Sequence, residues 1–185
     1  MGKLILFNMM TVDGYFEGED QSLEWHHVVT EFNDFAIEQL NSSDILVFGR
    51  VTYELMAGYW PSKDALKNDP VVAEKMNSIS KIIFTKTMDK ATWINTRHFR
   101  DHPELVIVEL KKNSTKNIYV FSSAYLSETF NRFKLFDEFR IMLNPIILGK
   151  GIPLFNNIPG QINLTLHQSR VFKSWNILLQ YLPKY

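Results

Sequence analysis

A glycine and an arginine stand where an apolar run meets a helix-compatible segment. Gly49 and Arg50 directly follow the run Asp44–Phe48, and Thr52 comes two residues later. The first N–H groups of a helix lack intrahelical partners and the helix dipole is positive there, so an anion is favoured. Arg50 adds a permanent positive charge, and a glycine lets a ligand approach the backbone closely. This pattern predicts a binding site for a phosphate group.

Two other apolar runs end in polar residues that could serve the same ligand. The run Lys81–Thr85 ends in a hydroxyl, and Lys86 follows it with a second cation. The run Asn117–Phe121 leads into Ser122 and a second strand-to-helix junction. Arg50 and Lys86 can also be read as ordinary surface charges, so the prediction depends on the strand ends lying together.

Composition narrows the function classes. The 185 residues contain 20 basic and 20 acidic side chains, so no net charge attracts nucleic acid or an anionic membrane. Cysteine is absent, which excludes disulfides and thiolate metal sites and fits a reducing cytoplasm. No apolar stretch approaches the roughly 20 residues of a membrane span. We expect one cytoplasmic domain, residues 1–185, that recognises anions by local charges.

The first half of the chain alternates strands and helices. The apolar run Lys3–Met10 predicts a buried strand that ends in a turn at Asp13 and Gly14, before a long polar loop. Apolar side chains at helical spacing predict a helix from Thr30. The other expected elements are a strand at 44–48, a helix at 52–57, a helix from Pro70 to about Asn77 with Asp69 as its N-cap, and a strand at 81–85.

The second half of the chain ends in strands. Residues 101–112 are ambiguous, because Pro103 and Lys111 suit the ends of a helix while the β-branched residues between them favour a strand. A strand at 117–121 and a helix from Tyr125 come next. The remaining predicted strands are 139–143, 162–171 and 177–182. This order predicts an α/β fold with a mixed sheet, helices on both faces and antiparallel strands at one edge.

Seven short segments follow one another at the spacings of a known family. They are Thr11–Tyr15, Phe48–Glu54, Tyr59–Pro61, Lys86–Thr87, Val120–Leu126, Asp137–Glu138 and Asn144–Phe155. In this order they resemble the dihydrofolate-reductase-like family that includes the reductase domain of riboflavin biosynthesis. The resemblance covers nearly the whole chain and is greatest to stand-alone, single-domain members.

The resemblance implies a dihydrofolate-reductase-like three-layer α/β fold, NADPH as cofactor and a homodimer. It favours a helix for Pro103–Lys112. Two cations near one additional phosphate, Arg50 and Lys86, favour NADPH over NADH. The residues that the resemblance assigns to the cofactor are Gly49, Arg50, Thr52, Thr85, Lys86, Ser122, Ser123, Ala124 and Leu126.

Ser122 departs from the family pattern, which usually has glycine at this position. Glycine suits it because the backbone must lie against the pyrophosphate and adopt unusual dihedral angles. The serine hydroxyl could donate to a phosphate, whereas its Cβ could crowd the cofactor. In a plain strand-to-helix turn, Ser122 or Ser123 would instead serve as an N-cap.

Candidate substrate contacts surround the first strand and the loop after it. Hydride transfer requires a nicotinamide placed against an electrophilic carbon with water excluded, and the loop from Asp13 to Glu24 could act as a lid. Asp13 could hydrogen-bond or protonate the substrate, or make a structural Asx-turn instead. The other candidates are Trp25, Tyr53 and Trp60 as aromatic walls, with core packing as the alternative, and Asn144 as a polar contact.

Other motifs are rejected on local grounds. Gly149-Lys150-Gly151 lacks a third glycine and a following helix, so it is not a dinucleotide fingerprint. His98 and His102 are four apart, but the segment around them looks loop-like at Thr96-Arg97 and contains Pro103, so we expect no metal site.

Three functions remain open. The first is NADPH-dependent reduction of a small heterocyclic or ribosyl substrate, most specifically of the 5-amino-6-(5-phosphoribosylamino)uracil type. The second is dihydrofolate or pterin reduction, for which Glu24, Glu31 and Asp34 are the candidate carboxylates. The third is a homodimer that binds NADPH without catalysis, motivated by Ser122.

Overall fold

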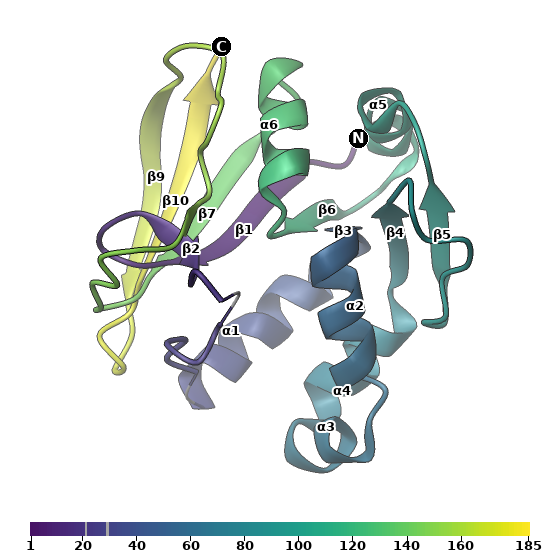
Figure 1. Cartoon of the computed structure of the whole chain (residues 1–185), viewed down its shortest axis with the longest axis horizontal. Coiled ribbons are helices and arrows are strands. Elements are labelled where there is room, and N and C mark those ends of the chain that lie inside the picture. Colours follow the sequence, from purple (N-terminus) through teal and green to yellow (C-terminus); the bar gives the residue numbers. More distant parts are fainter. Residues whose placement is uncertain (21, 29) are drawn as a thin grey trace.

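The computed structural model describes residues 1–20, 22–28 and 30–185 of the chain. Over these residues its centre is an eight-stranded sheet in the order β5-β4-β3-β6-β1-β7-β10-β9 (Figure 1). The strands of this sheet are β1 (Leu4–Met10), β3 (Ser43–Gly49), β4 (Ser80–Phe84), β5 (Thr96–Phe99), β6 (Asn117–Phe121), β7 (Glu138–Leu143), β9 (Asn163–Val171) and β10 (Ile177–Lys184). A separate pair consists of β2 (Tyr15–Glu17) and β8 (Ile152–Pro153). The helices are α1 (Thr30–Asn41), α2 (Arg50–Tyr59), α3 (Lys63–Asn68), α4 (Pro70–Ser78), α5 (Pro103–Asn113) and α6 (Ala124–Arg132).

The sheet is mostly parallel. β1 runs parallel to β6 and β7, β3 runs parallel to β4 and β6, and β5 runs parallel to β4. Parallel neighbours need crossover connections, which helices supply for β3 to β4 and a loop supplies for β4 to β5. β9 and β10 are joined by a short turn, and β10 is antiparallel to both β9 and β7. The predicted mixed α/β fold, with antiparallel strands at one edge, is confirmed.

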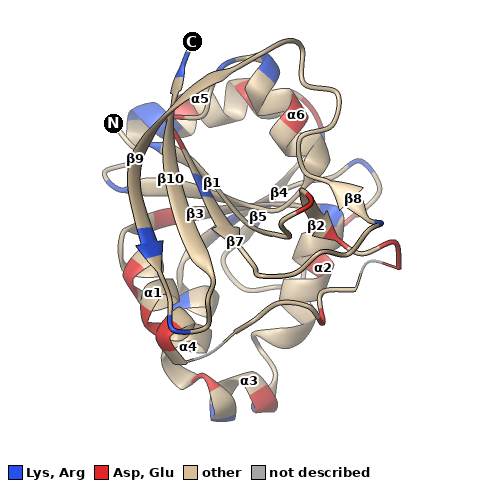
Figure 2. Ribbon diagram, turned by 90° about the vertical axis from the view of Figure 1, so that its left-hand side faces the viewer, with Lys and Arg blue, Asp and Glu red and all other residues tan. Residues whose placement is uncertain are grey.

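The strand β9 forms one edge of the sheet and is exposed on both faces. Leu164 and Leu166, whose alternation helped to predict the strand, are 42% and 51% exposed. The Lys, Arg, Asp and Glu residues of β9 and β10 are Arg170 and Lys184. Figure 2 shows these two strands almost entirely uncharged, whereas both signs of charge are spread over the helices. An exposed strand edge with apolar side chains is an open surface for association.

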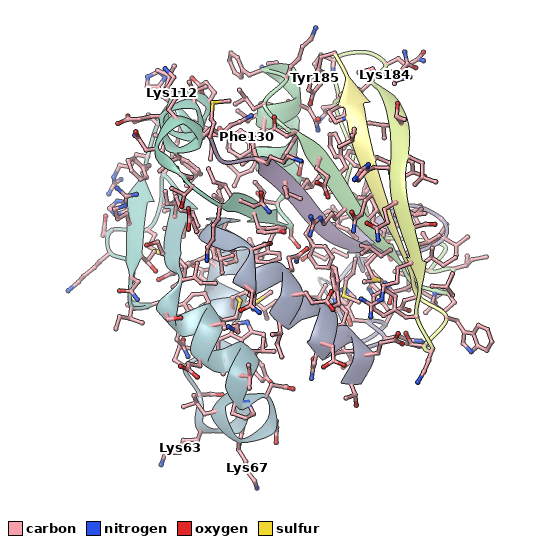
Figure 3. All side chains as sticks on the ribbon, turned by 180° about the vertical axis from the view of Figure 1, so that it is seen from behind. Lys63, Lys67, Lys112, Phe130, Lys184 and Tyr185 are labelled. Carbon is pink, nitrogen blue, oxygen red and sulfur yellow. The ribbon has the colours of Figure 1, made fainter. Side chains whose placement is uncertain are left out.

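Each face of the sheet carries its own apolar core, because helices cover both faces. Successive residues of β1 point to opposite faces of the sheet. Ile5 and Phe7 pack with α1 and α4 on one face, and Leu4 and Leu6 pack with α5 and α6 on the other. Phe130 of α6 is fully buried beside the sheet (Figure 3). Burial of one such side chain stabilises the fold by about 1.5–3 kcal/mol. Covering on both faces explains why β1 reads as a continuous apolar run.

In two segments after β4, the secondary structure is not the one that local propensity alone would give. Residues Pro103–Asn113 form α5, as the family resemblance favoured, because the complete burial of Ile107 against the sheet outweighs its β-branched preference. Thr96-Arg97 looked loop-like but belongs to β5, because parallel pairing with β4 supplies the backbone hydrogen bonds of this strand. The short elements α3, β2 and β8 also had no sequence prediction.

Candidate cofactor and substrate site

The carboxyl ends of β1, β3, β4 and β6 lie at one edge of the sheet, because these strands are parallel. A cavity of about 900 Å³ opens at this edge. Its walls include the segments Gly49–Thr52, Phe84–Thr87 and Phe121–Tyr125, which are the three predicted strand ends. Residues of α1 form another part of the wall. The structure thus brings the three predicted anion-binding segments together.

The N-terminus of α2 is open toward this cavity. Gly49 precedes the helix and has no side chain to cap it. Arg50 Nη1 lies 2.7 Å from Glu54 Oε2, and both side chains are nearly half exposed. An exposed ion pair of this spacing contributes only about 0.3–0.5 kcal/mol. A phosphate at the helix end can therefore compete with Glu54 for Arg50.

The junction before α6 has an unusual backbone. Ser122 has a φ of 54° and Ser123 a φ of 75°, both in the region that favours glycine. The Ser123 Oγ accepts a hydrogen bond of 3.3 Å from the Leu126 N–H and so caps α6. The physical reason for a glycine at Ser122 is therefore present in this chain, and the predicted N-cap role falls to Ser123. Leu126 itself is buried, and only its backbone takes part in the junction.

The two helix N-termini meet at Gly49. A Cβ placed on Gly49 would lie 2.5 Å from Ser123 Oγ and 3.0 Å from Ser123 Cβ, so only glycine fits there without displacement. Two positive helix ends next to each other favour a ligand with adjacent anionic groups, such as a pyrophosphate. Thr52 and Ala124 line the same cavity.

The strand end after β4 offers cations. Lys86 lines the cavity with a side chain that is 74% exposed and lies 3.9 Å from Asp101. The Thr85 Oγ1 accepts hydrogen bonds from the N–H groups of Thr87 and Met88, so it also stabilises its own turn. Arg100, which the sequence did not single out, lines the cavity and donates to the Lys86 carbonyl oxygen.

The predicted aromatic walls separate into two groups. Trp60 lines the cavity. Tyr53 is only 1% exposed and is not part of the cavity wall. Its hydroxyl oxygen accepts a 2.8 Å hydrogen bond from the backbone N–H of Trp93. Trp25 is also buried away from the wall and donates its indole N–H to the Ser22 carbonyl oxygen. Core packing, the alternative for these aromatic residues, holds for Tyr53 and Trp25.

Asp13 and Asn144 hold loops and do not line the cavity. The Asp13 carboxylate accepts hydrogen bonds from the Gly149 N–H at 2.7 Å and the Leu148 N–H at 3.3 Å. Bonding to the Thr11 hydroxyl, with these backbone contacts, lowers the pKa of Asp13, so it stays ionised and is a poor proton donor. The Asn144 Oδ1 accepts from the His27 N–H at 3.1 Å. Both residues therefore fix the backbone of neighbouring loops.

The cavity also contains polar residues that the sequence reasoning missed. They are Asn8, Glu17, His26, Asn33, Gln39 and Asp69. Burial lowers the pKa of His26 to about 4 and raises the pKa of Glu17. For Asn8 a sequence signal existed, since it is the polar residue inside the apolar run of β1. Glu17 ends the short strand β2, and the remaining residues lie on loops or helices, where polar residues are common.

A family model for the RibD C-terminal domain matches residues 2–178. The chain belongs to the RibD C-terminal domain family. This is a riboflavin-biosynthesis reductase-like family, and the resemblance stated from the sequence motifs is confirmed. The chain is 30% identical over 185 residues to the uncharacterized protein YyaP of Bacillus subtilis (strain 168), covering 97% of this chain and 94% of YyaP.

Solved structures show the same fold. A putative riboflavin biosynthesis protein from Shewanella sp. PV-4 superposes with a TM-score of 0.75 at 21% identity, covering 99% of both chains. The dihydrofolate reductase from Enterococcus faecalis, solved in complex with NADP(H), superposes with a TM-score of 0.66 at 16% identity, covering 100% of this chain and 98% of that one. The RibD C-terminal domain of this chain therefore has a dihydrofolate-reductase-like fold.

Two other kinds of site were sought in the described residues. No group of three or more His, Cys, Asp or Glu side chains in those residues is arranged to hold a metal ion. In the same part of the chain, no helix is long and apolar enough to cross a membrane.

Proposed function

We propose that the protein is an NADPH-dependent reductase of a small heterocyclic or ribosyl substrate, most specifically of the 5-amino-6-(5-phosphoribosylamino)uracil type. The observation that carries this proposal is the meeting of two helix N-termini at Gly49 and Ser123, with Lys86 and Arg100 on the same cavity wall. The paired helix ends suit a pyrophosphate, and the cations suit an additional phosphate. The fold shared with a dihydrofolate reductase in complex with NADP(H) adds support.

The residues of the cavity fit this cofactor by charge and by polarity. Bound NADPH would supply a hydride to an electrophilic carbon of the substrate. The chain itself binds the phosphates at the helix ends and walls the reaction with apolar side chains, including Met9, Phe32 and Phe35. Such walls exclude water and orient a flat ring. The strand pair β2 and β8 contributes Phe16 and Ile152 to the same wall.

Cofactor binding is tested by titrating tryptophan fluorescence with NADPH and with NADH, since Trp60 lines the cavity. We expect NADPH to bind more tightly, and Lys86→Ala to weaken NADPH more than NADH. Lys63→Ala is the control, because Lys63 lies on α3 and points away from the body of the protein (Figure 3). Absence of quenching at millimolar NADPH would refute the proposal.

Turnover is tested by the loss of NADPH absorbance with the aminouracil and with dihydrofolate. Pterin reduction, the second candidate, is disfavoured because no carboxylate of α1 lines the cavity in the described residues. The Glu31 carboxylate instead accepts from the Lys173 N–H at 2.7 Å, and Asp34 is not part of the wall. Glu24 lies on the loop before the helix and is exposed. We therefore expect NADPH to be oxidised faster with the aminouracil than with dihydrofolate.

Binding without catalysis is the remaining candidate, and the two serines with positive φ favour it. Their side chains restrict a junction at which the family usually has glycine. Tight NADPH binding with no oxidation across aminouracils, pterins and ketones would select this function over reduction.

We also propose a homodimer that associates through the β9 edge. The support is the exposure of this strand on both faces, with Leu164 and Leu166 uncovered and few charges beside them. Pairing of two such edges would satisfy the outward backbone groups.

A further inference from the structure

Asn8 is a buried polar residue in the middle of an otherwise apolar strand. It is 2% exposed and lies between Leu6 and Met10 on the face of β1 that packs with α5 and α6. An amide group buried without partners costs about 1–3 kcal/mol. An apolar residue would avoid this cost, so the amide needs an explanation from its contacts.

One end of the amide is fixed by the junction before α6. The Ser122 N–H donates to Asn8 Oδ1 at 2.8 Å. Because this partner is a donor, the oxygen of the amide must face it, and a flipped amide would oppose two donors. The contact also supports Ser122 in its left-handed conformation, which is costly for a residue with a Cβ.

The other end of the amide has no partner. Asn8 Nδ2 is buried and makes no hydrogen bond to the protein within the described residues. Asn8 lines the cavity together with Ser122 and Ser123. A buried N–H donor beside the two helix N-termini is therefore available to an acceptor atom of a ligand.

We propose that Asn8 is a cofactor-binding and positioning residue: its oxygen holds the Ser122 turn, and its NH₂ group donates to an oxygen of the dinucleotide. This inference rests on the proposed NADPH binding. The acceptor is an oxygen of the pyrophosphate or of the nicotinamide carboxamide, both of which accept hydrogen bonds. Asn8 thereby couples the conformation of the junction to the presence of the ligand.

The test replaces only the donor. Asn8→Asp keeps an oxygen acceptor for the Ser122 N–H and puts a second oxygen in place of the NH₂ group. We expect NADPH to bind about 10-fold more weakly or worse, as loss of a hydrogen bond and repulsion of an acceptor predict. A second ligand, 2′-phospho-ADP-ribose, which lacks the nicotinamide, is titrated in parallel. Equal weakening of both ligands assigns the pyrophosphate oxygen, and weakening of NADPH alone assigns the carboxamide.

Asn131→Asp is the matched control. Asn131 is 3% exposed and lies on α6, and it does not line the cavity. The Asn131→Asp substitution introduces the same buried acid without the proposed contact, so NADPH affinity should stay within twofold of the wild type. Equal weakening by both substitutions, or no weakening by Asn8→Asp, would overturn the inference.

A measurement on the wild type covers the case in which Asn8→Asp does not fold. The side-chain NH₂ resonances of Asn8, assigned in a ¹⁵N-labelled sample, should shift when NADPH is added. Unchanged resonances in a sample whose tryptophan fluorescence is quenched by NADPH would overturn the role of Asn8 alone. A wild type that binds neither ligand would instead refute the proposed function.

Discussion

Ser122 combines a side chain with a backbone conformation that favours glycine. Its φ is 54°, and the left-handed region costs a residue with a Cβ about 1–2 kcal/mol. Ser122→Gly should remove this strain and the Cβ beside the predicted pyrophosphate. We expect tighter NADPH binding, measured by fluorescence titration, and a melting temperature that does not fall.

Ser169→Gly is the comparison for this substitution. Ser169 is an exposed residue of β9 and is not among the residues with positive φ. Glycine in a strand costs about 0.5–1 kcal/mol, so this variant should melt lower while NADPH affinity is unchanged. If Ser122→Gly behaved like Ser169→Gly, the strain at the junction would not limit the cofactor.

His26 makes stability depend on pH. Burial lowers its folded-state pKa to about 4, whereas the unfolded value is 6.5. Between these values the unfolded chain binds the extra proton, so stability is lost as pH falls from 6.5 toward 4, by at most about 3 kcal/mol. Urea unfolding at pH 7 and pH 4.5 should show a smaller difference for His26→Gln than for the wild type. The same change at His102, whose side chain is 74% exposed, should leave the difference as it is.

At the scale of elements, Lys81 links β4 to the end of α4. It is fully buried, and its Nζ donates to the carbonyl oxygens of Met76, Asn77 and Ile79 at 2.7–3.0 Å. These carbonyls at the helix end have no intrahelical partners, and a cation also complements the helix dipole there. The ammonium group lies 4.5 Å from the centre of the Trp93 ring.

Lys81→Met should therefore destabilise the protein by about 2–4 kcal/mol, because the Met76 and Ile79 carbonyl oxygens lose the donor that Lys81 gives them inside the protein. Denaturant unfolding measures the loss. Lys75→Met is the control, because Lys75 donates to Asn41 Oδ1 in an exposed hydrogen bond, and loss of this bond should cost little stability. A loss no larger than that of the control would show that the carbonyls find other partners.

Elements with a clear apolar period could be predicted from the sequence, and those stabilised by distant partners could not. β1 and β3 were found because their runs are buried on both faces. β5 was missed because its strand identity comes from pairing with β4, which a local pattern does not contain. For α5, local propensity was divided, and burial of Ile107 on the sheet decided the outcome.

The candidate site follows the same division. Gly49 and Lys86 were found because strand ends in a parallel sheet share one edge. Tyr53 and Trp25 were placed at the substrate, but aromatic residues serve the core equally well and the sequence does not tell which side they face. Asn8 was missed although it interrupts an apolar run, because its hydrogen-bond partner, Ser122, lies 114 residues away in the sequence.

At the scale of the whole molecule, the sheet has two different edges. β5 is four residues long, whereas β9 has nine residues and exposes Leu164 and Leu166. Short edges resist pairing, and long apolar ones invite it. We therefore expect the protein to be a dimer at micromolar concentration, with a molar mass near twice that of the chain by sedimentation.

Leu166→Glu tests this edge, because a buried carboxylate at the interface would oppose association. The variant should sediment as a monomer and keep its fold by circular dichroism, since Leu166 is 51% exposed in the isolated chain. Leu105→Glu is the control: Leu105 is 63% exposed on α5, on another part of the surface, and its substitution should leave the dimer intact. A wild-type monomer would contradict the proposed assembly, and a dimer that survives Leu166→Glu would place the interface away from β9. Because no residue of β9 lines the cavity in the described part of the chain, NADPH affinity should be the same for the monomeric variant and the wild type.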